Sequence, residues 1–149
     1  MSQKLSSLIY CSRNNIRGDL AIVNAQLKSI LAAARTRNRA AGVTGALLYS
    51  SARFAQVLEG PSHAVESTFE RIQRDARHGD VVVLRMSPIQ ARQFPEWSMA
   101  LAVPSPAQES LVTKAFLSSA ENQAGTGMEI LRLLRDLTTQ KTVETHSLA

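Results

Sequence analysis

The sequence has only one cysteine and no long apolar run, and both shortages restrict what the protein can be. Cys11 is the single cysteine among 149 residues, which excludes an internal disulfide and a metal site made of several cysteines. No apolar stretch approaches the ~18 residues that a membrane-spanning helix requires, and the opening MSQKLSSLIYCSRNN lacks the long apolar core of a secretion signal. We therefore expect a cytoplasmic protein with no membrane association and no bound metal.

A strong excess of charge of one sign is also missing. Seventeen Lys and Arg residues against twelve Asp and Glu give a net charge of +5, which permits binding to nucleic acid or to an acidic partner but is too small to require either. Hydrophobic residues make up 44% of the chain and charged residues 19%, as in ordinary globular proteins. The length allows one domain with a modest core and a small appendage.

What the chain does contain is an alternation of short strand patterns and longer helix patterns. Strand patterns are runs of β-branched and apolar residues between turn residues, and helix patterns repeat apolar residues every three or four positions. Asp19 is suited to cap the first helix and Gly42 to end it, whereas Pro61 and Ser62 open the second. The expected elements are a strand at 5–11, a helix at 19–42, strands at 42–49 and 53–59, a helix at 62–79, and strands at 80–87 and 97–103.

This order, βαββαββ, predicts an α+β fold of the ferredoxin-like sandwich type, with a mixed sheet and two helices on one face. The other face of such a sheet is uncovered. After Pro104 and Pro106, apolar residues again repeat at helical spacing in two groups that Gly125 and Gly127 separate. We therefore expect a domain at 1–103 and a helical pair at 104–149 that covers the open face, mediates self-association, or both. The two groups are Leu111, Val112, Ala115 and Phe116, and Ile130, Leu131, Leu133, Leu134 and Leu137.

Three polar residues occupy inward positions of three different elements. Asn38 continues the apolar stripe of the first helix, and Gln56 shares a strand face with Phe54 and Leu58 because strand side chains alternate. Tyr10 lies on the inward face of the first strand. A buried amide without partners costs ~1 to 3 kcal/mol. Bonds to loop backbone would explain either amide alone, but together the three side chains offer the donors and acceptors that the edge of a planar heteroaromatic ligand needs.

The end of the second helix, RIQRDARHGD, supplies a further polar set made of Asp75, Arg77 and His78. The helix dipole favours cations in the last turn, so capping explains Arg77 and His78, and contact with a ligand is the alternative. A site that is apolar in its walls and polar at its rim would suit a flat cofactor. The apolar walls between the two helices would come from Ile30, Phe54 and Ile72.

Several of these segments together resemble one protein family. SLIYCSR, GVTGALLY, RFAQVLEGP, F-x-RIQRDARH and FPEWSM follow one another within residues 5–102, and in them the chain is similar to the BLUF family, blue-light sensors that use flavin. Each motif alone is weak, but the ordered combination is specific. The resemblance implies a ferredoxin-like sandwich that holds FAD non-covalently between its two helices, needs no metal and turns over no substrate.

The resemblance also implies roles for individual residues. Tyr10 matches the photoactive tyrosine, Gln56 the switching glutamine between that tyrosine and the flavin ring, and Asn38 the asparagine that bonds the ring edge. Trp97 and Met99 match the last-strand pair that carries the signal onward. The remaining positions implied to bind the cofactor are Ile30, Phe54, Arg71, Ile72, Asp75, Arg77 and His78.

The mechanism that the resemblance implies moves an electron and a proton from Tyr10 under light and leaves Gln56 rotated or tautomerised. Because one reordered hydrogen bond contributes only ~1 kcal/mol, we expect the signal to act on a soft element, the last strand and the helices after Pro104. The expected result is a change in self-association or in affinity for a separate effector protein. Arg37 departs from the family pattern, since many members have asparagine or histidine there.

Two other functions are compatible with the predicted fold. Arg13 and Asn14, after the first strand, would suit an acyl-phosphate hydrolase. A nucleic-acid-binding domain would need exposed aromatic side chains on the central strands, where Tyr49 and Phe54 are the candidates. Bound flavin whose absorption shifts to the red under blue light would exclude both.

Overall fold

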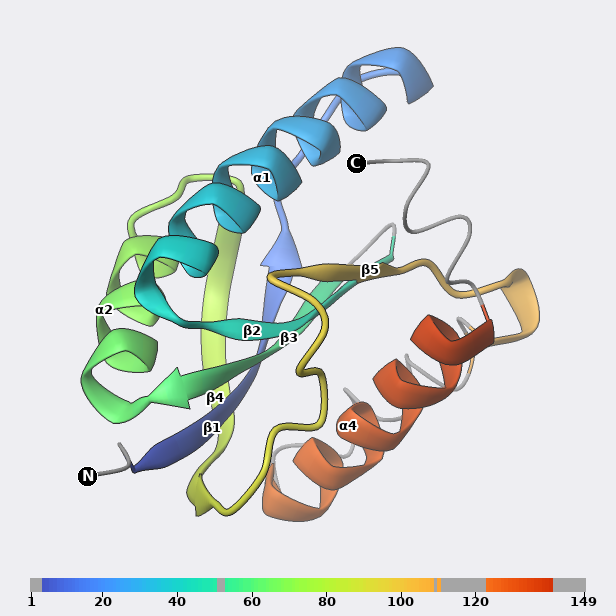
Figure 1. Cartoon of the computed structure of the whole chain (residues 1–149). Coiled ribbons are helices and arrows are strands. Elements are labelled where there is room, and N and C mark those ends of the chain that lie inside the picture. The colour runs from blue at the N-terminus through green and yellow to red at the C-terminus, as the bar shows by residue number, and fades with distance from the viewer. Residues whose placement is uncertain (1–3, 51–52, 109, 111–122, 141–149) are drawn as a thin grey trace.

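The computed structural model describes residues 4–50, 53–108, 110 and 123–140. Within these residues the strands form one sheet in the order β4-β1-β3-β2-β5, and helices cover both of its faces (Figure 1). β2 and β5 pair in parallel and the other neighbours pair antiparallel. This mixed sheet confirms the predicted α+β sandwich. The elements are β1 (Leu5–Asn14), α1 (Leu20–Ala41), β2 (Thr44–Tyr49), β3 (Arg53–Pro61), α2 (Ser62–Gln73), β4 (His78–Ile89), β5 (Ala100–Ala102) and α4 (Gln123–Gln140).

The first helix begins and ends where the sequence predicts. The Asp19 side chain accepts a hydrogen bond from the backbone N–H of Ile22 at 3.0 Å, which satisfies one of the donors left unpaired at a helix start. Gly42 ends the helix at φ 74°, a left-handed conformation that glycine adopts at little cost. The helix turns Leu27, Leu31 and Asn38 toward the sheet, and so the predicted stripe is confirmed.

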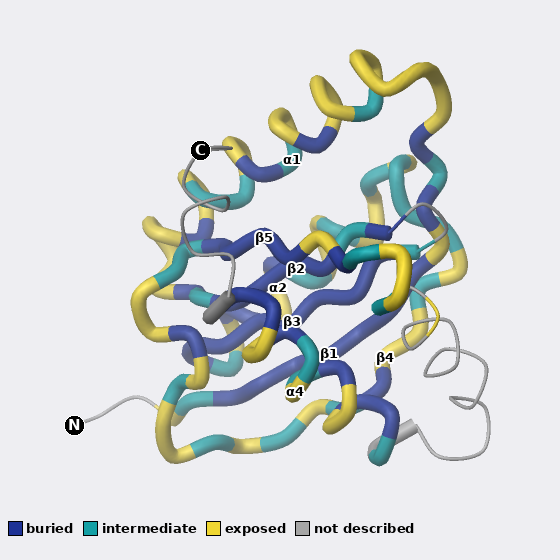
Figure 2. The backbone as a smooth tube through the Cα atoms, turned by 90° about the vertical axis from the view of Figure 1, so that its right-hand side faces the viewer, coloured by how far each residue is buried: buried dark blue, intermediate teal, exposed yellow. Residues whose placement is uncertain are grey.

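The sheet separates two cores, because alternate residues of β1 and β3 point to opposite faces. On the side of α1 and α2, the core includes Leu8, Tyr10 and Leu58. On the side of α4 it includes Ile9 and Val57. Figure 2 shows the central strands as almost continuously buried. Any group that lies between α1, α2 and the sheet is therefore separated from α4 by one layer of backbone.

The last described helix covers the sheet face that the two-helix sandwich leaves open, as predicted. Ile130, Leu134 and Leu137 are fully buried in the core on that side. The expectation that Gly125 and Gly127 separate two helices is wrong, because both lie within α4. A β-carbon on Gly127 would lie 3.3 Å from the Cβ of Arg85, so close packing on β4 outweighs the poor helix propensity of glycine, ~1 kcal/mol. The helix predicted through residues 111–116 lies outside the residues that the structure describes.

The second helix is shorter than predicted. It ends at Gln73, so Asp75, Ala76 and Arg77 form a turn and His78 begins β4. The backbone N–H of Arg77 donates to the Asp75 carboxylate at 3.0 Å, an interaction by which an aspartate competes with the helix for backbone donors. The prediction that Asp75, Arg77 and His78 belong to the last turn of a helix is therefore wrong, and helix capping does not explain them.

The last strand is also shorter than predicted, because β5 contains only residues 100–102. The carbonyl groups just before it bond elsewhere: that of Trp97 accepts from Gly45 N–H at 3.1 Å, and that of Ser98 accepts from the Asn38 amide at 2.8 Å. One backbone bond to β2 and one side-chain bond from α1 thus take the place of regular strand pairing in this segment. β1 is longer than predicted and extends through Asn14, which pairs with His78.

Two negative observations concern only the described part of the chain. No helix there combines the length and the apolar composition needed to cross a membrane. Likewise, no group of three or more His, Cys, Asp or Glu side chains in that part is arranged to hold a metal ion.

Candidate functional site

A series of hydrogen bonds joins two of the three inward polar residues that the sequence predicts, Tyr10 and Gln56, to Met99. Tyr10 and Gln56 lie directly opposite each other in the pairing of β1 and β3, and the Tyr10 hydroxyl donates to Gln56 Oε1. The Gln56 amide in turn donates from Nε2 to Met99 Sδ at 3.2 Å. A thioether sulfur is a weak acceptor. The donor end of a buried amide is therefore bound only weakly, at a position where a stronger acceptor would be favoured.

The Tyr10 side chain is fully buried. Burial raises its pKa well above the ordinary range, and the nearby Asp75 carboxylate and Cys11 add to the rise. The phenol consequently keeps its proton at physiological pH. Its ring lies 5.5 Å from the ring of Phe69, so apolar packing fixes the hydroxyl toward Gln56.

The C-terminal half of α1 holds the segment that contains Met99. Asn38 is buried and donates from Nδ2 to the Ser98 carbonyl. One turn earlier, Arg35 Nε donates to the Met99 carbonyl at 3.0 Å, and burial lowers the pKa of the Arg35 guanidinium. These two bonds fix the Met99 backbone, and thereby its sulfur, relative to Gln56.

A cleft that is partly open to solvent lies between α1 and α2 above these residues. Its walls combine aliphatic side chains with amides, arginines, an aspartate and a histidine, as in sites for flat heteroaromatic ligands. The predicted binding residues that line it are Ile30, Asn38, Gln56, Arg71, Ile72, Asp75, Arg77 and His78. Sequence reasoning assigned no contact here to Ala33, Ala34, Arg37, Leu47 and Thr68, which also line it.

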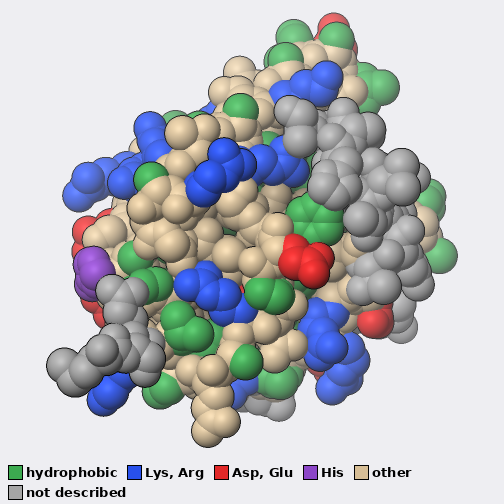
Figure 3. Space-filling view, viewed as in Figure 1, with side chains coloured by type: hydrophobic (Ala, Val, Ile, Leu, Met, Phe, Trp, Pro, Cys, Tyr) green, Lys and Arg blue, Asp and Glu red, His purple; other side chains and the backbone are tan. Residues whose placement is uncertain are grey.

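For one of these unpredicted cleft residues, Thr68, the sequence does contain a signal. It is a buried polar residue on α2, four positions before Ile72, and residues four apart lie on the same side of a helix. Arg37, which departs from the family pattern, also lines the cleft. Its side chain is exposed at the cleft, as is that of Arg71 on α2. Lys and Arg side chains gather along α1 (Figure 3).

Two predicted contact residues, Tyr10 and Phe54, do not line the cleft. Both are fully buried in the core beneath it. Phe54 packs its ring 4.6 Å from the His78 ring, and Tyr10 reaches the cleft only through Gln56. Their contribution is therefore to support the residues that face the cleft.

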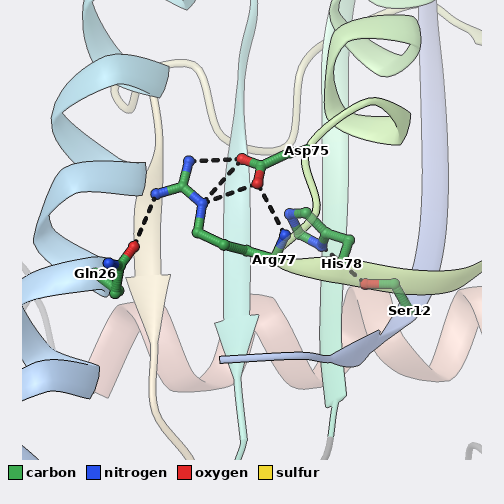
Figure 4. A network of polar contacts seen from close by, with 5 residues as sticks. All are labelled: Ser12, Gln26, Asp75, Arg77 and His78. Atoms are coloured by element: carbon green, nitrogen blue, oxygen red, sulfur yellow. Dashed lines mark hydrogen bonds and ion pairs between the residues drawn. The ribbon is translucent and has the colours of Figure 1, made fainter. Parts of the chain in front are cut away.

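The turn after α2 carries a compact polar network (Figure 4). The Arg77 guanidinium bonds both oxygens of the Asp75 carboxylate, at 2.6 to 3.1 Å. These bonds lower the pKa of Asp75, against the opposing effect of burial. Arg77 also reaches Gln26 on α1 at 3.5 Å. The network thus joins α2 to α1 at one end of the cleft.

His78 completes this end of the cleft. Its Nδ1 is hydrogen-bonded to Ser12 Oγ at 2.9 Å. Burial lowers the pKa of His78, with Asp75 opposing and Arg77 reinforcing the effect. The imidazole is therefore neutral at pH 7 and acts as a polar wall without charge.

Trp97 and Met99 do not share a face, although the strand predicted at 97–103 would place residues two apart on the same side. Met99 is buried on the side of α1 and α2 and lines the cleft, whereas Trp97 packs against the core on the side of α4. The reason is that residues 97–99 precede the regular strand, so strand alternation does not set their directions. This short segment passes from one core to the other.

Three of the four residues expected for the two alternative functions have other roles. Asn14 is buried, donates to the Ser50 carbonyl at 3.0 Å and accepts from Ile16 N–H at 2.9 Å. Arg13 forms an exposed ion pair with Asp80 at 2.7 Å. Phe54 is fully buried and is therefore unavailable to stack on a base.

Comparison with known proteins identifies the family. The family model for BLUF, described as sensors of blue-light using FAD, matches residues 5–100. The chain belongs to the BLUF family. The model covers more than half of the chain, including the cleft and the residues beneath it. BLUF proteins are blue-light sensors that bind flavin, so the predicted fold and sensor function are confirmed.

Known BLUF proteins resemble this chain in sequence and in structure. BlrB, a BLUF protein in its dark state, is 30% identical with a TM-score of 0.75, and the match covers 91% of this chain and 98% of BlrB. Photoactivated adenylate cyclase subunit beta of Euglena longa is 43% identical over 77 residues, 51% of this chain and 9% of that protein. BlrP1 of Klebsiella pneumoniae with FMN and cyclic diGMP is 32% identical with a TM-score of 0.59, covering 73% of this chain and 30% of that one.

This chain spans 9% of the length of the first curated relative. The family model ends at residue 100 of this chain. The cyclase activity in that relative's name is therefore outside what the similarity establishes for this chain.

The cleft residues fit the flavin that BLUF proteins bind. Ile30 on α1 and Ile72 on α2 line it, so a planar ring between the helices meets aliphatic side chains. The Gln56 amide, bonded only to sulfur at its donor end, could exchange that acceptor for a ring carbonyl or nitrogen. Asn38 and the Asp75–Arg77 pair add polar groups, which match the polar pyrimidine edge of a flavin.

Proposed function

We propose that this protein is a blue-light photoreceptor that holds FAD between α1 and α2, with Tyr10 and Gln56 as its photoactive pair. The description of the family by its use of FAD supports this cofactor. A BLUF relative is known with FMN, so the two nucleotides need a direct test. Chromatography of the flavin released by heating the purified protein identifies which one is bound, and FMN or riboflavin as the main species would contradict the FAD assignment.

The observation that carries the proposal is the hydrogen-bond chain from Tyr10 through Gln56 to Met99 at the floor of the cleft. A carboxamide in this position contacts a phenol on one side and faces a ligand site on the other. Rotation of this carboxamide by half a turn exchanges its acceptor, Oε1, with its donor, Nε2, because the two ends have the same shape. A change at the ligand can therefore alter which hydrogen bonds Gln56 donates and accepts.

When bound, a photoexcited flavin supplies a strong one-electron oxidant. The raised pKa of Tyr10 keeps it a phenol, so loss of an electron is coupled to release of its proton, and Gln56 Oε1 is already bonded to that proton. Return of both particles restores Tyr10 and consumes nothing. Gln56 is left rotated, with Nε2 toward Tyr10 and Oε1 toward Met99, or as a tautomer with altered donors and acceptors.

The output of this change runs through residues 97–99 to the part of the chain after Pro104. Gln56 contacts Met99 directly, and Trp97, two residues earlier, packs in the core that contains α4. A reordered hydrogen bond contributes ~1 kcal/mol, enough to bias an equilibrium but not to drive a large rearrangement. We assign residues 104–149 as the output region, acting in the cytoplasm through self-association or a separate effector protein. Equal dark and illuminated hydrogen-exchange rates throughout this region would contradict the assignment.

The test of the central proposal is spectroscopic. The flavin-loaded protein should show a red shift of its absorption under blue light that reverses in the dark. Gln56→Ala and Tyr10→Phe should bind flavin and lose this shift. The matched control is Tyr49→Phe, since Tyr49 lies on β2 outside the cleft, and it should keep the shift. A normal photocycle in Gln56→Ala or Tyr10→Phe would contradict the roles assigned to these two residues.

A further inference from the structure

A buried carboxylate lies on the sheet face opposite the cleft. Glu59 is on β3 and fully inaccessible to solvent. Its two oxygens accept hydrogen bonds from the backbone N–H groups of Gln93 at 2.7 Å and Phe94 at 2.9 Å. It does not line the cleft. Burial of a charged group costs a substantial free energy unless the group is well hydrogen-bonded. Glu59 is hydrogen-bonded to the loop that joins β4 to β5.

We call this loop, residues 90–99, the connector. Besides Glu59, the Arg92 guanidinium fixes its beginning by donating to Thr44 Oγ1 at 2.9 Å and to the Gly42 carbonyl at 2.8 Å. Further along, Trp97 N–H donates to the Phe94 carbonyl at 3.3 Å. The connector therefore continues from the Glu59 contacts directly into residues 97–99.

The far end of the connector lies at the cleft. The Ser98 carbonyl accepts from Asn38, and Met99 Sδ accepts from Gln56 Nε2. Glu59 is three residues from Gln56 along β3, so its side chain and that of Gln56 point to opposite faces of the sheet. One strand thus holds both ends of the same connector, with Glu59 on one face and Gln56 on the other.

The charge of Glu59 matters to this contact. An ionised carboxylate accepts hydrogen bonds at both oxygens, whereas a protonated one has a hydroxyl in place of one acceptor. Burial raises the pKa of Glu59, and the two amide donors and Arg92 oppose the rise. Arg92 is the charged group that faces it from the connector, and its paired neighbours Ser7 on β1 and Thr44 on β2 are uncharged.

We propose that Glu59 is a positioning residue of the photocycle: its carboxylate holds the connector so that the Met99 sulfur stays beside Gln56, and it thereby sets the rate of return from the lit to the dark state. The inference rests on the proposed photoreceptor function. Return requires Met99 in its place, so the rate scales with the fraction of molecules whose connector is ordered. Loss of a hydrogen bond to a charged group lowers the equilibrium constant for connector ordering by about tenfold, which is the largest slowing that one lost bond of this size produces.

The first experiment compares Glu59→Gln with Glu96→Gln in the flavin-loaded full chain. Glu96 is an exposed residue of the same connector, so its replacement removes the same charge without touching the buried contact. We expect Glu59→Gln to bind flavin with unchanged affinity, to keep the red shift and to recover in the dark more slowly than the wild type, by up to about tenfold. Glu96→Gln should recover at the wild-type rate.

A pH profile of recovery separates positioning from a merely structural role. Protonation removes one of the two acceptors, so wild-type recovery should slow as the pH falls through the raised pKa of Glu59, above the usual value of about 4.3. Glu59→Gln cannot titrate there and should lack this slowing. It keeps Asp75 and His78, two titratable groups that line the cleft, so any slowing common to both proteins belongs to groups other than Glu59.

Hydrogen exchange on the wild type tests the contact even if Glu59→Gln does not fold. The amides of Gln93 and Phe94 should be protected in the dark relative to the amide of the exposed Glu96. Absence of that protection overturns the proposal, as does a Glu59→Gln variant that recovers at the wild-type rate or faster, or that retains the wild-type pH profile. Absence of a red shift in the wild type would instead refute the photoreceptor function on which the inference rests.

Discussion

Replacement of Tyr10 by phenylalanine removes one hydroxyl from a fully buried site and leaves Gln56 Oε1 without its donor. Gln56 is 5% exposed, so water does not readily replace the lost partner. An unsatisfied buried acceptor costs ~1 to 3 kcal/mol. For a protein of this size each kcal/mol lowers the melting temperature by about 2 to 4 °C. We therefore expect Tyr10→Phe to unfold at a measurably lower urea concentration and to lose the light-induced red shift.

A double-mutant cycle measures the coupling between Tyr10 and Gln56. Gln56→Leu leaves the Tyr10 hydroxyl without its acceptor and should cost a similar ~1 to 3 kcal/mol. Tyr10→Phe combined with Gln56→Leu removes both polar partners, which is close to neutral when the shapes are kept. The free energy of unfolding of the double variant should therefore be higher than that of either single variant, with a coupling of ~1 to 3 kcal/mol.

The assay is urea unfolding in the dark, followed by circular dichroism at one fixed concentration of flavin for all variants, because bound ligand itself adds stability. Tyr49→Phe serves as the control and should change the free energy of unfolding by less than ~0.5 kcal/mol. If the two single losses simply add in the double variant, Tyr10 and Gln56 are not coupled, and the hydrogen bond at the centre of the proposed mechanism is refuted.

Three further predictions concern stability. Leu134→Ala should lower the free energy of unfolding by ~2 to 5 kcal/mol because this α4 side chain is fully buried. Replacement of the half-buried Leu131 by alanine should lower it less, and equal losses in urea unfolding would argue against α4 as a core helix. Gly45→Ala should prevent normal folding, since its β-carbon would lie 1.9 Å from a β3 carbonyl oxygen, whereas Gly42→Ala meets no close contact but is strained by φ 74° and should only lower the melting temperature. Asp75 has a lowered pKa because of its arginine partner, so its stabilising effect should be present above the unfolded pKa of about 3.9 and be lost as the pH falls through the lower folded value. Asp75→Asn should lack this acid-dependent part of the unfolding free energy, and an unchanged pH dependence would contradict the assignment.

The elements that local chemistry governs could be predicted from the sequence. The cap at Asp19, the stop at Gly42 and the stripe that buries Asn38 follow from side-chain chemistry and helical spacing. Strand alternation likewise placed Tyr10 and Gln56 on the inward face, where the structure pairs them. In the same way, the apolar pattern at 130–137 predicted a helix on the open sheet face, because such a face must be covered.

Other features depend on contacts between distant residues, which spacing along the chain does not encode. Helix α2 ends early because Asp75 bonds the backbone and side chain of Arg77, and α4 continues through Gly127 because it packs closely on β4.

The opposite directions of Trp97 and Met99 follow from bonds that Gly45, Asn38 and Arg35 make to the backbone of that segment. The sequence alone thus determined which residues are polar and face inward. Only the tertiary structure decided which partner each of them bonds, because a hydrogen bond requires two groups at contact distance and their separation in space is set by the packing of the whole sheet.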